Sequence, residues 1–204
     1  LVTAGPDRLQ LDRSASQLVR TPPADHPADR SHSLRLAVAP PDGTWSPVAV
    51  EVTGERTSVD VPEGHAVLVD PWEDTWAACL ADDTTLALLP DLVTRTEDPM
   101  LRAGIWNSVR SGFHHAEVDP DAVVDLAEAW LPVESQDAGL TYTTPWLLRS
   151  AVPLSSDPAT AASRLHAAAL RAALEAEPMR LRQIAPDVAR MAYGALDRRL
   201  NLTV

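Results

Sequence analysis

The hydrophobic pattern of the chain changes near residue 80, and this change constrains the fold more than any other feature. Before it, short apolar runs are separated by prolines and by turn-forming pairs such as Asp42-Gly43, as is typical of β-strands. After it, apolar residues recur every three to four positions, which is the period of helices. We therefore predict a multidomain α and β protein with a small β-sandwich over residues 1–80, followed by an α-helical, solenoid-like domain over residues 81–204.

The first part contains seven short runs of aliphatic and β-branched residues. In the run SLRLAV, Leu34, Leu36 and Val38 alternate with Arg35 and Ala37, so one face of this strand is expected to be buried and the other exposed. Seven short strands joined by turns favour a sandwich of two sheets. The predicted strands cover residues 1–3, 9–11, 17–20, 34–39, 48–52, 58–61 and 66–69.

Three helices in the second part are predicted to begin at Asp-Pro pairs. An Asp side chain caps the free N–H groups of a first turn, and Pro fits the first helical position. The regular spacing of these helix starts favours antiparallel helix pairs, as in a solenoid or an irregular bundle. No consensus sequence recurs from one pair to the next. The pairs are Asp98-Pro99, Asp119-Pro120 and Asp157-Pro158, the helical stretches are 98–112, 119–131, 159–176 and 181–195, and Pro90 and Pro186 are expected to kink or restart helices.

Charge, cysteine content and hydropathy exclude several classes of function. The formal net charge is −12 and all 17 basic residues are scattered Arg, so nucleic acid is a poor partner. The single cysteine, Cys79, cannot form an internal disulfide, and its apolar surroundings predict a packing role. No stretch reaches the roughly 18 apolar residues of a membrane span, and no signal core opens the chain, which predicts no membrane contact and a cytoplasmic location.

No recognisable catalytic or metal-binding constellation occurs in the sequence. The zinc motif His-Glu-x-x-His is absent, and the adjacent His114 and His115 would diverge on a helix. The segment 21–30 reads as a loop, and His26, Asp29 and His32 in and beside it could meet a metal, but such sets are common in polar loops. We therefore predict no metal ligand and no catalytic residue, and rank a hydrolase built from scattered His and Asp residues last.

Six tryptophans are distributed over both parts of the chain. A peptide-binding groove could use them, but core packing is the better interpretation because Trp106 and Trp130 lie on the apolar stripes of their helices. Trp72 and Trp76 stand near the change of pattern, where they could join the two predicted domains. The other two are Trp45 and Trp146.

Five segments resemble the carboxy-terminal half of the aminopeptidase N family of zinc metallopeptidases. They are LVTAG, SLRLAV, VEVTGERTSVDVPE, HAVLVDPWEDTWA and EDPMLRAGIWNSVRSG. The last fits the pattern DP-x-x-R-A-x-x-W found in similar bacterial enzymes. The segment 70–76, near the junction of the two predicted domains, differs from the Asn-Asp-x-x-x-Tyr-like sequence expected there, since it has Asp70 and Trp76. The resemblance covers essentially the whole chain.

This resemblance implies a function that the residues alone do not. The chain would be a fragment of a larger enzyme that removes amino-terminal residues from peptides, with zinc and a general-base Glu in a catalytic domain that precedes Leu1. A spacer sandwich and helical walls would shape and gate the peptide chamber. The implied partners are that catalytic domain and peptide substrates, and this chain alone would not be an enzyme. The alternative is a stand-alone adaptor in which sandwich and helices bind a protein partner.

Overall fold

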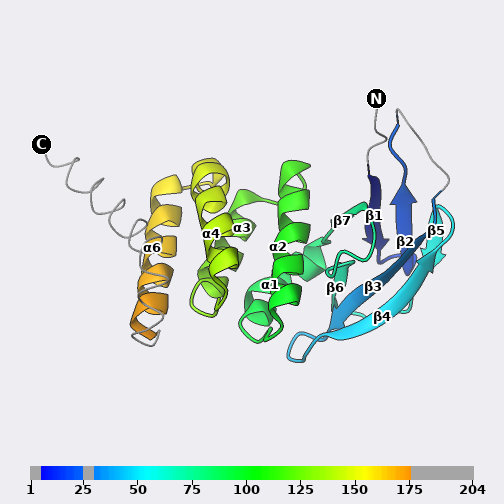
Figure 1. Ribbon diagram of the computed structural model, residues 1–204. Helices are drawn as coiled ribbons and strands as arrows, with labels where there is room; N and C mark the ends of the chain where they lie inside the picture. Colours follow the sequence, from blue (N-terminus) through cyan, green and yellow to red (C-terminus); the bar gives the residue numbers. More distant parts are fainter. Residues whose placement is uncertain (1–5, 25–29, 176–204) are drawn as a thin grey trace, which may run out of the picture. The chain divides into compact units, whose positions relative to one another are not determined.

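The computed structural model describes residues 6–24 and 30–175, and the chain forms two compact units, residues 1–118 and 119–204. Within the first unit, seven strands are followed by helices α1 and α2 (Figure 1). The predicted division at residue 80 coincides with the change from strands to helices, because β7 ends at Leu80 and α1 begins at Asp83. The compact units divide later, after Val118, because α1 packs on β6 and α2 packs on both β6 and β7.

Two sheets make up the β part of the first unit. One has the strand order β5-β2-β1-β7 and the other β4-β3-β6. Neighbouring strands are antiparallel, except that β1 and β7 run parallel, with Asp7 opposite Ala77. The strands are β1 Asp7–Asp12, β2 Gln17–Thr21, β3 His32–Ala39, β4 Ser46–Val52, β5 Arg56–Ser58, β6 Ala66–Val69 and β7 Ala77–Leu80.

Side chains from both sheets form one hydrophobic core, which gives this part a sandwich-like character. The core residues are Leu9, Leu11, Leu18, Leu34, Leu36, Val38, Val52, Val59, Val67 and Val69. Their burial supplies the main driving force for pairing the sheets. The predicted mixture of α and β structure is therefore confirmed.

Burial along β3 and β4 departs from simple alternation. Leu34 and Leu36 are buried and Arg35 is exposed, as predicted, but Ala37 is buried as well. Nearby Ala39 packs with Leu92 of α1, so the helix covers the end of the second face of this sheet. Along β4, burial falls from Val52 to the exposed residues 46–49.

Six of the seven predicted strands overlap observed ones. The predicted strand 58–61 shares only Ser58 with β5, and β7 was not predicted. The predicted strand over residues 1–3 lies outside the described residues.

Three helices begin at the Asp-Pro pairs, as predicted. Asp98 accepts the N–H of Met100 at 2.9 Å, and Asp119 accepts the N–H of Asp121 at 2.8 Å. Asp157 accepts the N–H groups of residues 159 and 160. These helices are α2 Pro99–His114, α3 Pro120–Trp130 and α6 Pro158–Glu175.

Two of the remaining helical segments contain an internal proline. Helix α1 continues through Pro90, so this residue does not begin a new helix, and α4 likewise contains Pro145. The segments are α1 Asp83–Val93, α4 Asp137–Trp146, a π-helix η1 Leu147–Ala151 and α5 Val152–Leu154. The predicted stretch 181–195 and Pro186 lie outside the described residues.

The second unit is organised around α3. Its Trp130 is 0% exposed, and the indole N–H donates to Glu134 at 2.7 Å. Arg164 of α6 binds two acidic residues of α3, with its Nε 2.8 Å from Glu128 and one terminal nitrogen 2.6 Å from Asp125. Apolar packing and this charged clamp together hold α6 against α3.

Replacing Asp98 by Ala should lower the free energy of unfolding of the first unit by about 1 kcal/mol, because the helix α2 loses its capping acceptor. The neighbouring Glu97→Ala is the matched control, since the Glu97 side chain is exposed and the bond from Arg102 goes to its backbone carbonyl, which the variant keeps. Urea unfolding followed by circular dichroism measures both. An effect no larger for Asp98→Ala than for Glu97→Ala would contradict the capping role.

Candidate functional site

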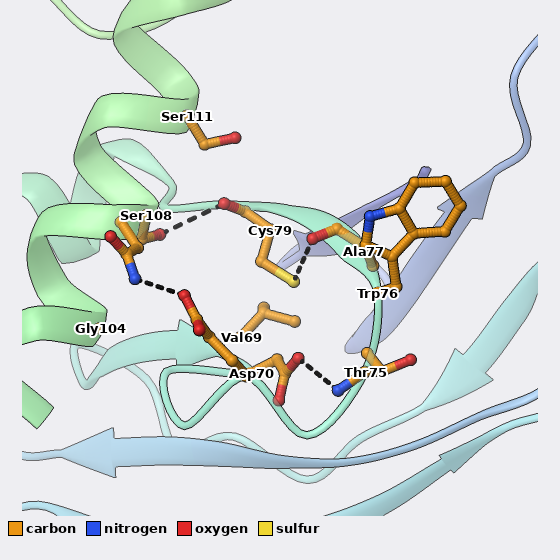
Figure 2. A pocket seen from close by; sticks show the side chains of 11 residues that line it. Val69, Asp70, Thr75, Trp76, Ala77, Cys79, Gly104, Ser108 and Ser111 are labelled. Atoms are coloured by element: carbon orange, nitrogen blue, oxygen red, sulfur yellow. Dashed lines mark hydrogen bonds between the residues drawn. The ribbon is translucent and has the colours of Figure 1, made fainter. Parts of the chain in front are cut away.

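A pocket of about 430 Å³ lies in the first unit between the β6–β7 connection and one face of α2 (Figure 2). The connection and its flanking strands supply Val69, Asp70, Glu73, Thr75, Trp76, Ala77 and Cys79, and α2 supplies Gly104, Asn107, Ser108 and Ser111. Polar and apolar groups therefore converge on a cavity of the size that small ligands occupy, about 300–1,000 Å³.

Asp70 organises the connection. Its backbone N–H donates to the carbonyl of Arg35 at 3.0 Å, and its carboxylate accepts the N–H groups of Asp74 and Thr75 at 2.7 and 3.0 Å. Asp70 and Glu73 both have positive φ angles, 50° and 57°, which non-glycine residues rarely adopt. Burial raises the pKa of the Asp70 carboxyl, and the nearby Asp74 and Glu73 charges add to this effect.

Helix α2 approaches the connection closely because Gly104 has no side chain. A Cβ atom at this position would lie 2.1 Å from the carbonyl oxygen of Pro71. The next residues along this helix bind the connection, since Asn107 donates to Glu73 at 2.5 Å. Ser108 donates to the carbonyl of Cys79 at 3.5 Å. The pocket wall is thus fixed from both sides.

Cys79 presents its thiol beside the pocket (Figure 2). Burial, and to a smaller extent the charge of Asp70, raises the pKa of this thiol to about 12. The reactive thiolate is therefore scarce at neutral pH. This supports the packing role predicted for Cys79 and argues against nucleophilic chemistry there.

Alkylation of Cys79 by iodoacetamide at pH 8 should be at least about 100-fold slower in the folded chain than in the chain unfolded by urea, given the thiolate fractions expected for the two pKa values. Mass spectrometry of timed samples gives both rates. Equal rates would show that the folded thiol is neither buried nor electrostatically suppressed.

A buried charged network lies behind the pocket. Asp7 is 0% exposed, and its carboxylate lies 2.9 Å from His32 Nε2. His32 Nδ1 lies 2.7 Å from the Thr75 hydroxyl. Arg20 and Arg30 each place a guanidinium nitrogen 3.8 Å from the Asp7 carboxylate, and Arg20 also donates to the carbonyl of Arg30.

This network has the order carboxylate, imidazole and hydroxyl that activates nucleophiles in hydrolases. The Thr75 hydroxyl, however, points away from the Cys79 and Ser108 side chains in Figure 2, and it lies 2.7 Å from His32 Nδ1. The network instead ties β1, β3 and the β6–β7 connection together.

The histidines considered from sequence have separate positions. His32 joins the buried network, whereas His26 and Asp29 lie outside the described residues. His114 ends α2, and the adjacent His115 contacts the carbonyl of Ser111 at 2.7 Å. Within residues 6–24 and 30–175, no group of three or more His, Cys, Asp or Glu residues could hold a metal ion.

Trp106 and Trp130 are buried core residues, as predicted, and Trp146 is buried as well. Trp72 and Trp76 lie within the first unit, where guanidinium groups stack on them. Arg35 is 4.5 Å from the centre of the Trp72 ring and Arg30 is 5.3 Å from that of Trp76. Both arginines lie in or just before β3.

No protein-family model matches this chain, and no curated protein does either. In the part of the chain that the structure describes, no helix has both the length and the apolar character that crossing a membrane requires.

Proposed function

We propose that this chain is the non-catalytic carboxy-terminal region of a zinc-dependent aminopeptidase, an enzyme that removes amino-terminal residues from peptides. The observation that carries the proposal is the role of the segment that fits DP-x-x-R-A-x-x-W. Asp98 caps α2, Arg102 is buried and donates to the carbonyls of Thr96 and Glu97, and Trp106 is buried. Pro99 occupies the start of α2, so four of the five residues of the pattern support the fold, as expected of a scaffold.

Three of the other resembling segments support the same proposal, and LVTAG lies outside the described residues. SLRLAV forms most of β3, VEVTGERTSVDVPE spans the end of β4 and all of β5, and HAVLVDPWEDTWA spans β6 and the connection to β7. Each contributes residues to the core or to the buried network. The resemblance therefore concerns parts of the chain that build one compact unit.

In the proposed enzyme, the sheets act as a spacer and the helices as walls of the peptide chamber. A helical wall excludes folded proteins and limits bulk water at the reaction site, while short peptides can enter. Zinc and the general base belong to the catalytic domain of the same polypeptide, and zinc would polarise the peptide carbonyl and activate water there. We assign no catalytic residue and no metal ligand to this chain.

The proposal is tested by incubating this chain with leucine p-nitroanilide in the presence and absence of added Zn²⁺. We expect no release of p-nitroaniline and no zinc retained after gel filtration. Turnover that follows the protein peak, and that Thr75→Val abolishes, would contradict the proposal and would favour a hydrolase built on the Asp7–His32–Thr75 network.

A stand-alone adaptor is the second candidate, and one observation favours it. Large apolar side chains are exposed on both units, namely Trp76 and Met100 on the first and Tyr142 and Leu154 on the second. Exposed apolar surface of this kind can bind a protein partner. In an adaptor these residues would contact that partner, whereas in the proposed enzyme they would contact other parts of the same polypeptide.

A further inference from the structure

We draw no further inference here: the strongest candidate, the buried cluster of Asp7, Arg20 and His32 between β1, β2 and β3, belongs to the charged network already described, and nothing among residues 6–24 and 30–175 points to a ligand at it.

Discussion

Replacing Asp7 by Asn is expected to lower the free energy of unfolding of the first unit by about 3–5 kcal/mol, the usual cost of breaking a buried ion pair from one side. Asp7 is fully buried, and its carboxylate is the common partner of His32, Arg20 and Arg30. Asn has nearly the same shape but no charge. The variant therefore leaves the 8% exposed Arg20 without its counter-ion.

Amide hydrogen exchange of β1 and β3 measures this effect where it arises, because it reports the free energy of local and global opening. Asp12→Asn is the matched control on the same strand. Asp12 pairs with Arg56 on the surface, at 3.5 Å, and surface pairs contribute little. If the two variants lost protection equally, the buried network would not be a major source of stability.

Replacing Trp130 by Ala is expected to cost the second unit about 3–5 kcal/mol, which is typical of large cavities left in a core. Trp130 is fully buried on α3. The cavity left by its removal would therefore have apolar walls, which water does not fill favourably. The loss of the Trp130 N–H also removes a hydrogen bond to Glu134, whose carboxylate binds the N–H groups of Ser135 and Gln136 as well. Both effects act on the helices that pack around α3.

The measurement is loss of amide protection in α3 and α6, which contact each other directly. Tyr142→Ala is the control, since this aromatic side chain of the same unit is 71% exposed and its removal should change stability by at most about 0.5 kcal/mol. Trp130→Phe should be intermediate because most of the apolar volume is kept. Full protection in Trp130→Ala would contradict the assignment of Trp130 as the centre of this core.

Local signals in the sequence were sufficient to locate much of the fold. The Asp-Pro pairs predict the starts of α2, α3 and α6 because capping involves only neighbouring residues. β7 was missed because it has no alternating pattern and is stabilised by parallel pairing with β1, about 70 positions earlier in the chain. Pro90 obscured the extent of α1, since single prolines usually end or kink helices, and α4 was not predicted.

The site could not be found in the same way. The pocket depends on the approach of α2 to the β6–β7 connection, which Gly104 permits through a contact with Pro71. His32 was considered as a metal ligand beside its chain neighbours, yet its partners are Asp7 and Thr75, which lie 25 and 43 positions away. No local motif encodes such contacts. Asp70 and Thr75 of the connection do, however, lie in HAVLVDPWEDTWA, one of the segments that resemble the aminopeptidase N family.

The most direct test of the central proposal is the coding sequence immediately upstream of Leu1. The account predicts an in-frame region that encodes a His-Glu-x-x-His helix followed by a glutamate ligand, and a protein made from the complete reading frame that binds zinc and releases amino-terminal residues. A start codon next to Leu1, with no such region before it, would contradict the account and would place the adaptor first.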